Sequence, residues 1–487
     1  PIGTGDPYYH YAYERLPREP LAGDFVRVRT VTQPFRPDQR ITLNVRVNGG
    51  PVTTERMAVS RTADGEMCWE AALGRFAFGD RVDYWFECAD DGSVSDVFSF
   101  RARAWLPISQ PVGWSSDGRS VRLSFRPVPG AASGPSLVFD DAAGDGTLRI
   151  RFDARDAAAG GTDGTRTTGE TGKTGEAEYA GEAAPFPAEG LTATFGELEL
   201  AVRPDAEFAV RHRGRVLLQT YGRGGQPAVE LLTDGSGRIW KVRYNFRFEE
   251  GDRVYGMGER YARLEYRGLA VDNYVYNEYR SQGMRTYLPV PFVLHSRGFG
   301  LFANTPMYTV FDFGASLSDR MQVQADLHAE RSSLDLLLLP GEPLEAIRRY
   351  TDVTGKPALP PKWAFGPWMS SNNWDSQAEV ARQVALTQEH EIPATVIVLE
   401  QWSDEATFYI FNDAQYEVKD GNEAFGYEDF TFPPWGRWPD PKGMVEALHA
   451  SGLKVLLWQI PVHKFMYGIA HAQHDADEAA MLANGYH

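Results

Sequence analysis

The sequence predicts a multidomain protein, with all-β sandwiches in about its first 340 residues and a parallel α/β region after them. Short runs of alternating apolar and polar residues, bounded by turn residues, continue to about residue 340 and are typical of antiparallel strands. From about 341 onward, helical segments alternate with continuous apolar strands, which indicates a parallel sheet covered by helices. The 487 residues suffice for about two to four domains.

Residues 1–105 are predicted to form an accessory β-sandwich of the immunoglobulin type. Residues 40–47 and 81–87 alternate between apolar and polar side chains, and turn residues follow both runs. The two cysteines of the chain, Cys68 and Cys88, fall in strand-like runs of this region. We expect free buried thiols, because cysteine is among the most buried residue types. A disulfide between neighbouring strands is the alternative.

Residues 106–340 are predicted to form a second, larger β-sandwich. Alternation is clear at 120–125 and at 198–203, on the two sides of a segment, 154–185, that is rich in Gly, Thr, Ala and Glu. Few large apolar residues occur in this segment, so burial cannot offset the entropy of ordering it. We expect a mobile surface loop within the sandwich, which proteases should cut first. A linker between domains is the alternative.

The region 341–487 is predicted to alternate helices and strands. The expected helices span 341–350, 375–390, 441–451 and 474–484, and the expected strands span 363–369, 394–399 and 453–458. The first helix is indicated by the helical spacing of Leu344, Ile347 and Tyr350. Asp375 and Asp440 are the expected N-caps of the second and third helices, and a proline follows Asp440 at the first helical position.

The three strands fit either a small open sheet or the beginning of a closed barrel. A closed parallel α/β barrel needs eight strands and about 250 residues. Roughly half that length follows Lys362, so the pattern alone does not choose between the two.

Indole rings and polar groups occur together where each of the three strands ends. The residues concerned are Trp368 and Met369 at the end of the first strand, Glu400, Trp402 and Asp404 after the second, and Trp458 at the end of the third. A pyranose needs a flat apolar ring to stack on and carboxylates or amides that bind its hydroxyls. The alternative is that the tryptophans are core residues and the acids are solvated loop charges, but the same combination at three strand ends favours sugar binding.

Composition and charge exclude several classes of partner. A net charge of −17 disfavours nucleic acid and anionic membrane surfaces. No apolar run approaches the roughly 20 residues that a membrane crossing needs. The first residues show no signal peptide, so we favour a cytoplasmic location, although a removed export signal leaves no trace. No cofactor is implied.

Three ordered motifs resemble glycoside hydrolase family 31. Residues 254–260 resemble the glycine-rich signature of its N-terminal sandwich, 350–366 the entry to its barrel, and 430–444 the segment before its second barrel helix. The resemblance covers about residue 107 to the end. It implies that 341–487 is the first part, about three βα units, of a parallel (β/α)8 barrel that is incomplete in this chain.

The resemblance implies several substrate-binding residues. Glu400 stands where the family usually has an Asp that binds hydroxyls of the sugar in the −1 subsite, so its longer side chain is a departure. Trp458 matches an aromatic residue that lines this subsite, and Met369 falls where an aromatic is often found. Asn277 and Glu278 match a sandwich loop that reaches over the barrel mouth.

The resemblance places no catalytic residue in this chain. The family's nucleophile and acid/base are aspartates that would be expected after His487. Metal ligation by His463, His471 and His474 is not expected, because they form no helical pair on a defined face. The glycines of 256–258 lack the strand–helix setting of a nucleotide-binding loop.

The resemblance implies retaining hydrolysis or transglycosylation of α-linked gluco-oligosaccharides through a covalent glycosyl-enzyme. The long, aromatic and acidic loop 400–440 offers acceptor subsites, which favours a second hypothesis, a 6-α-glucosyl or isomaltosyl transferase acting on branched or cyclic α-glucans. A non-catalytic carbohydrate-binding protein is the alternative from another class. We expect a C-terminal complementary polypeptide to complete the barrel and cover the edge of its third strand.

Overall fold

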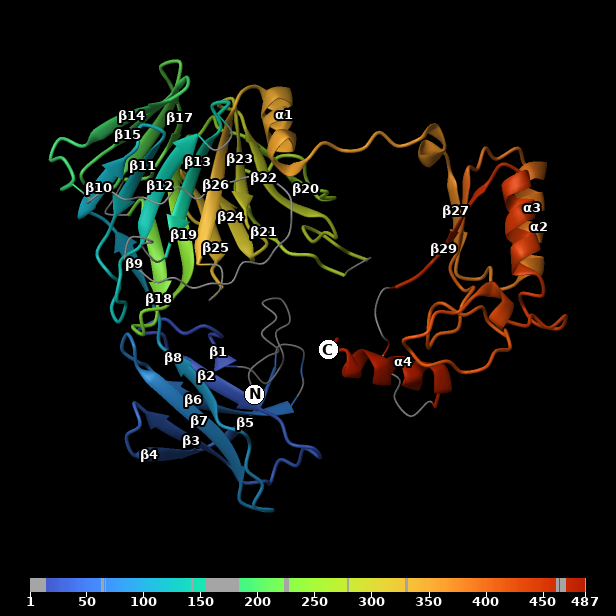
Figure 1. The fold of residues 1–487 in the computed structure, drawn as a ribbon. Helices are drawn as coiled ribbons and strands as arrows, with labels where there is room; N and C mark the ends of the chain where they lie inside the picture. Colours follow the sequence, from blue (N-terminus) through green and yellow to red (C-terminus); the bar gives the residue numbers. More distant parts are fainter. Residues whose placement is uncertain are drawn as a thin grey trace. The chain divides into compact units, whose positions relative to one another are not determined.

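The computed structural model describes residues 15–486 except 63–64, 66, 142–143, 155–183, 223–226, 278–279, 329–331, 461–463 and 465–469. The chain divides into two compact units, Pro1–Lys356 and Pro357–His487, here called the first and second units. Figure 1 shows a first unit built mainly from strands, with helix α1 at its end, and a second that mixes strands and helices. Within the described residues, no helix is both long and apolar enough to cross a membrane.

The first unit begins with a small β-sandwich of two four-stranded sheets. One sheet has the order β1 (Arg15–Leu16), β2 (Val26–Thr30), β6 (Met67–Gly74) and β5 (Ala58–Arg61). The other has the order β4 (Val52–Arg56), β3 (Ile41–Val47), β7 (Arg81–Cys88) and β8 (Phe98–Arg101). Inward side chains of both sheets, such as Val28, Leu43 and Tyr84, share one core. Cys68 and Cys88 are free and buried, which confirms the prediction, and burial raises the pKa of the Cys68 thiol.

A larger β-sandwich of three sheets completes the strands of the first unit. The eight-stranded sheet runs β10 (Gly113–Ser116), β11 (Ser120–Ser124), β12 (Ser136–Asp141), β13 (Leu148–Asp153), β26 (Ser333–Pro340), β23 (Phe299–Asn304), β22 (Pro289–His295), β20 (Val254–Gly258). The six-stranded sheet runs β21 (Ala270–Asn273), β24 (Thr309–Phe313), β25 (Arg320–Asp326), β19 (Ile239–Arg247), β18 (Val229–Thr233), β9 (Ala104–Ile108). The four-stranded sheet runs β14 (Leu191–Phe195), β15 (Leu198–Val202), β16 (Phe208–His212), β17 (Arg215–Gln219).

One hydrophobic core spans this larger sandwich. It contains Phe152 of β13 and Phe195 of β14, so the strands on the two sides of the predicted insert belong to the same core. The insert therefore lies within one sandwich and does not link two domains. Its predicted mobility concerns residues 155–183, which lie outside the described part of the chain.

Helix α1 (Pro343–Thr354) packs on the larger sandwich and belongs to the first unit. The ring of Tyr350 stacks on Phe292 with 4.5 Å between ring centroids, and Phe302 meets its edge at 5.0 Å. Leu344 is 83% exposed, so the predicted apolar face of this helix is wrong at that position. The predicted start of the α/β region at 341 is therefore wrong, and the second unit begins at Pro357. The reason is that the aromatic contacts of α1 are with strands of the larger sandwich.

A buried histidine is expected to make the first unit sensitive to acid. His295 lies between the rings of Phe248 and Phe299, with Asp252 Oδ2 at 3.9 Å from its Nε2. Arg297 donates two hydrogen bonds, of 2.9 and 2.7 Å, to the same aspartate. Burial lowers the pKa of His295 to about 4 from 6.5.

The first unit is expected to lose stability as the pH falls from about 6.5 to 4. In this window the unfolded chain binds a proton at His295 and the folded protein does not, so acid favours unfolding by up to about 3 kcal/mol. Urea unfolding at pH 7 and at pH 4.5 measures the loss. The His295→Gln variant cannot titrate there and should show a smaller pH dependence; equal dependence in both proteins would contradict the assignment.

The second unit contains a three-stranded parallel sheet with two helices beside it. The sheet has the order β27 (Trp368–Ser371), β28 (Val396–Leu399), β29 (Lys454–Leu457). Figure 1 shows α2 (Gln377–Glu389) and α3 (Pro441–Ala450) together on one side of it. Two 3₁₀ turns, η1 (Lys362–Phe365) and η2 (Tyr427–Asp429), and α4 (Ala472–Ala483) complete the unit.

The helix caps and strand starts test the predictions for this region. Asp440 caps α3 as predicted, since its carboxylate accepts a hydrogen bond from the Gly443 amide. The cap of α2 is Ser376 and not Asp375, because the Ser376 hydroxyl accepts from the Glu379 amide. The predicted strand at 363–369 is wrong in its first half: residues 362–365 form η1, and the strand starts at Trp368.

Candidate active-site face and aromatic pocket

The parallel sheet of the second unit has one covered face and one open face. Ile397, Leu399 and Val455 belong to the core that includes residues of α2 and α3. Side chains alternate along a strand, so the neighbouring positions point away from these helices. Trp368 is 46% exposed and Leu456 is 39% exposed, as expected for that second side. We call it the open face, made of Trp368, Ser370, Val398, Glu400, Leu456 and Trp458.

Glu400 and Ser370 meet on the open face. Glu400 directly follows β28, and Ser370 lies in β27 opposite Val398. The Ser370 hydroxyl donates a hydrogen bond to Glu400 Oε1. This bond orients a partly exposed carboxylate, and among the described residues its other oxygen accepts no hydrogen bond, so it can bind a ligand hydroxyl. Ser370 is a residue that the sequence analysis did not single out, and the strand pairing is what brings it to Glu400.

Only one of the two predicted tryptophans lies at the strand ends with Glu400. Trp458 follows β29 and is level with Glu400, whereas Trp368 is the first residue of β27 and pairs with Val396 at the start of β28, so its predicted place at a strand end is wrong. Trp458 is 41% exposed and meets the edge of Phe408, with 5.9 Å between ring centroids. The ring of Trp368 stacks on that of Trp363 with 6.5 Å between ring centroids, and its indole N–H donates a hydrogen bond to the Ala364 carbonyl at 3.2 Å. An exposed indole beside an oriented carboxylate is the combination that a pyranose ring requires.

The structure does not bring every predicted residue to this face. Met369 packs against the core on the covered side. Trp402 is 3% exposed, and its indole N–H donates to the Trp458 carbonyl at 2.7 Å. The Asp404 carboxylate accepts bonds of 2.8 Å from the amides of Ala406 and Thr407, so it caps its own loop.

The two predicted sandwich residues belong to the first unit of the chain. Asn277 belongs to the first unit, where the Tyr287 hydroxyl donates to its Oδ1 at 2.9 Å. Glu278 lies outside the described residues. The role of both residues over the barrel mouth stays a prediction.

The remaining acids near the strand ends are engaged in other contacts. Asp413 accepts two bonds from the Arg437 guanidinium, which holds the pKa of that carboxyl below its usual range. Glu405 is exposed and pairs with Lys464 at 2.8 Å. A retaining glycosidase needs two carboxyls about 5–5.5 Å apart across the scissile bond. Asp413 and Glu405 are instead held by cationic side chains, those of Arg437 and Lys464.

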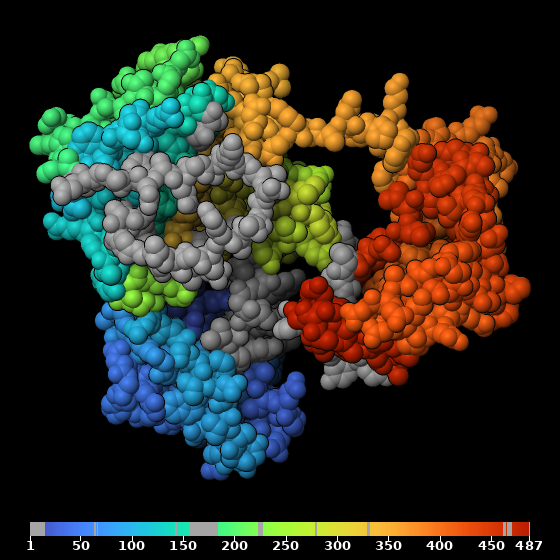
Figure 2. Space-filling model, viewed as in Figure 1, coloured from blue at the N-terminus to red at the C-terminus, as the bar shows by residue number. Residues whose placement is uncertain are grey.

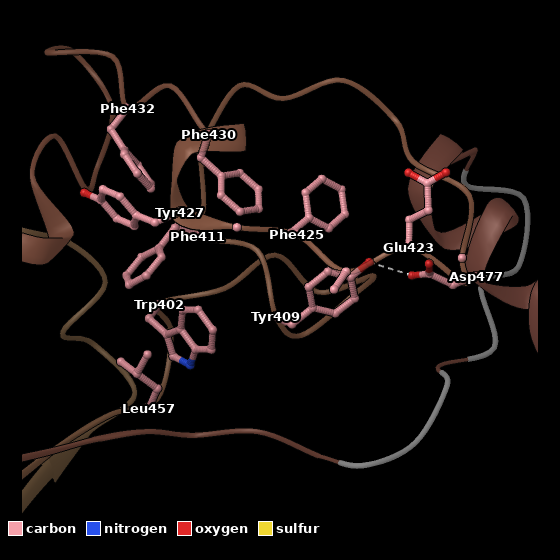
Figure 3. Close-up of a pocket in the computed structure, with 13 residues that line it drawn as sticks. Trp402, Tyr409, Phe411, Glu423, Phe425, Tyr427, Phe430, Phe432, Leu457 and Asp477 are labelled. Carbon is pink, nitrogen blue, oxygen red and sulfur yellow. Dashed lines mark hydrogen bonds between the residues drawn. The ribbon is translucent and has the colours of Figure 1, made fainter.

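An aromatic pocket of about 620 Å³ lies in the loop between β28 and α3, closed on one side by α4. Its lining consists of Trp402, Tyr409, Phe411, Gly421, Glu423, Ala424, Phe425, Gly426, Tyr427, Phe430, Phe432, Leu457 and Asp477. Figure 3 shows the rings gathered around the cavity and the two carboxylates together at one end. From the sequence this loop is predicted to bind sugar, and Trp402 is the one lining residue that was expected there.

Helix α4 fixes the shape of the pocket. Gln473 is 1% exposed, and its side-chain amide makes two hydrogen bonds to the backbone of Lys419. Its Oε1 accepts from the Lys419 amide at 2.9 Å, and its Nε2 donates to the Lys419 carbonyl at 3.1 Å. The same Nε2 donates to Asp477 at 2.9 Å, and the Tyr409 hydroxyl donates to the other Asp477 oxygen at 2.8 Å. A glycine at 421 is required, because a Cβ there would lie 2.7 Å from the Ala476 carbonyl oxygen.

The histidines near the third strand end have structural partners. His471 caps α4 by accepting a bond from the His474 amide, and the buried His474 contacts the Lys464 carbonyl through Nε2 at 2.7 Å. His463 lies outside the described residues. Across the part of the chain that the structure describes, no three His, Cys, Asp or Glu residues form a group that could hold a metal ion.

Several solved and characterised proteins are similar to this chain. An isomaltosyltransferase from Sporosarcina globispora is 35% identical over 492 residues, which is 100% of this chain and 44% of that protein. A 1,3-alpha-isomaltosidase from Kribbella flavida is 35% identical over 264 residues, covering 53% of this chain and 36% of that protein. The structure of the cycloalternan-forming enzyme from Listeria monocytogenes with a pentasaccharide substrate superposes with a TM-score of 0.83 at 34% identity, over 99% of this chain and 44% of that one.

Three family descriptions match successive parts of the chain. Residues 1–69 match the Lmo2446-like, N-terminal family. Residues 143–312 match the glycosyl hydrolase 31 N-terminal galactose mutarotase-like domain, and residues 357–485 match the glycosyl hydrolases family 31 TIM-barrel domain. The chain thus spans less than half the length of the isomaltosyltransferase and of the cycloalternan-forming enzyme. Its larger sandwich and its three βα units show that it belongs to glycoside hydrolase family 31.

Proposed function

We propose that the full protein transfers α-glucosyl or isomaltosyl units between α-glucan chains, with retention of anomeric configuration. The observation that carries the proposal is the open face, where Ser370 orients the Glu400 carboxylate beside the exposed ring of Trp458. The similarity of the whole chain to an isomaltosyltransferase and to a cycloalternan-forming enzyme supports transfer.

The open face supplies binding groups for such a reaction. Glu400 accepts hydrogen bonds from hydroxyls of the sugar whose anomeric carbon reacts, and Trp458 stacks on its apolar side. A carboxylate nucleophile displaces the leaving oxygen, which takes a proton from a second carboxyl, and forms a covalent glycosyl-enzyme. A sugar hydroxyl of the acceptor then attacks the anomeric carbon, returns its proton to the second carboxyl and releases the nucleophile.

Hydrolysis is the second candidate function. It uses the same two carboxyls, and water replaces the acceptor in the second step. The similarity to a 1,3-alpha-isomaltosidase over 264 residues favours it. The two functions differ in what reaches the glycosyl-enzyme, so product analysis separates them.

We infer that further polypeptide pairs with the free edges of the sheet and supplies both catalytic aspartates. Among the described residues, β27 and β29 each pair only with β28, and a three-stranded parallel sheet cannot close on itself. The open face also leaves apolar Leu456 and Trp458 exposed. The greater length of the relatives supports a continuation of the same protein, although a separate subunit would satisfy the same contacts.

The test is an assay of the full-length protein on α-(1→4)-, α-(1→6)- and α-(1→3)-linked gluco-oligosaccharides, with chain 1–487 alone as the inactive control. Proton NMR of the earliest products should show the α anomer, and chromatography should show products longer than the substrate or cyclic. Glucose or isomaltose released without longer products would favour hydrolysis. A β anomer formed first would contradict retention, and binding without either product would identify a non-catalytic carbohydrate-binding protein.

A further inference from the structure

The aromatic pocket lies on the opposite side of the strand ends from the open face. Leu457 lines the pocket and packs with the covered side of the sheet. Trp458, the next residue, is exposed on the open face. Between them stands Trp402, which lines the pocket while its indole N–H bonds the Trp458 carbonyl. Neither Glu400 nor Trp458 lines the pocket, so the pocket and the open face are separate surfaces on the two sides of Trp402.

The walls of the pocket carry paired flat rings. Phe425 and Phe430 stack with 5.0 Å between centroids and 26° between planes, and Tyr427 and Phe432 stack at 5.3 Å and 30°. Tyr427 is 48% exposed, so this is not a sealed core. Such rings offer platforms for the C–H faces of pyranose rings. A volume of about 620 Å³ lies within the range of small-molecule sites and admits more than one sugar unit.

The polar groups of the pocket select a neutral ligand rich in hydroxyls. Glu423 and Asp477 lie together at one end of the cavity (Figure 3). Carboxylates accept hydrogen bonds from hydroxyl groups and repel phosphate or sulfate groups. The chain as a whole has a net charge of −17, which acts in the same direction.

The pocket is held in shape before any ligand arrives. Asp477 is oriented by two donors, the Tyr409 hydroxyl and the Gln473 amide. Gln473 also fixes the Lys419 backbone, and Gly421 lets the loop lie directly on α4. A site whose groups are already oriented loses less entropy when a ligand binds.

We propose that the aromatic pocket is a second carbohydrate-binding site, which holds an α-glucan chain outside the open face. The choice of an α-glucan as ligand rests on the function proposed above. The separation from Glu400 and Trp458 means that the pocket retains the polymer and does not position the scissile bond. The space-filling view shows the second unit, in orange and red, that carries this site (Figure 2).

The test is native affinity electrophoresis of the full-length protein in gels that contain soluble dextran, with the Glu400→Gln substitution present to slow turnover. The pocket variant is Tyr427→Ala with Glu423→Gln; both side chains are exposed, so the fold is retained. We expect its dissociation constant for dextran to rise at least about 10-fold, because the loss of one charged hydrogen bond alone accounts for about that factor and the loss of a ring contact adds to it. The matched control, Tyr486→Ala with Glu478→Gln, also removes one exposed tyrosine and one exposed carboxylate and should bind normally.

Three outcomes decide the proposal. Equal retardation of the pocket variant and the control would overturn it. Pocket-dependent binding of hydroxyethylcellulose in place of dextran would overturn the assignment to α-glucans. Pocket-dependent binding of dextran by a full-length protein that neither transfers nor hydrolyses α-glucosyl units would support the second site and would refute only the proposed function.

Discussion

Replacing Glu400 with glutamine in the full-length protein is expected to lower kcat/KM on α-gluco-oligosaccharides by about 100-fold. The amide keeps the shape of the side chain and removes the charge, and a hydrogen bond to a charged group contributes about 1.5–3 kcal/mol. Ser370 holds this carboxylate in place for binding. The loss of kcat/KM should therefore come mainly from weaker hydrogen bonds to the bound sugar. Steady-state kinetics on a natural substrate measures it.

The control for this experiment is Glu405→Gln. Glu405 lies in the same loop and carries the same charge, but its carboxylate is exposed and pairs with Lys464. A surface pair of this kind contributes little, so activity should stay within about twofold of wild type. Substrates with activated leaving groups should still form the covalent intermediate in the Glu400 variant. Trapping of that intermediate on Glu400 itself would refute a binding role.

Replacing Trp438 with alanine is expected to destabilise the second unit by about 3–5 kcal/mol. Trp438 is 1% exposed, belongs to the core of this unit and meets the edge of Phe411 with 5.8 Å between centroids. Its removal leaves a cavity between the loop and α3. Hydrogen exchange of the α3 amides, followed by mass spectrometry, should show opening at a correspondingly lower free energy.

Trp435 provides the comparison, because it is the same residue type three positions earlier and is 73% exposed. Trp435→Ala should change the stability of the second unit by less than about 0.5 kcal/mol. Similar losses in the two variants would mean that the core of this unit is not built around Trp438.

The sequence predicted those parts of the fold that depend on local patterns. The apolar runs that become β28 and β29, and the Asp440 cap of α3, follow from side-chain type and spacing alone. The break at residues 362–365 was missed because the aromatic run there resembles a strand, although Pro361 lies before it and favours a turn.

The candidate sites were predicted less completely because they depend on contacts between distant residues. Glu400 and Trp458 could be named from their place at strand ends, whereas the Ser370 partner depends on the pairing of β27 with β28. The density of aromatic residues between 402 and 432 indicated a binding loop. No local signal distinguishes Gln473, since its role comes from a backbone 54 positions earlier in the chain.

The packing of α1 determines where the polypeptide can be divided for separate production. A fragment ending at residue 340 would leave the rings of Phe292 and Phe302 without the Tyr350 ring that covers them. The exposed apolar surface would then promote aggregation. A fragment ending at Lys356 keeps the helix and its cover, at the border between the two compact units. Crystallisation or labelling of the β-rich half is therefore best attempted with the longer fragment.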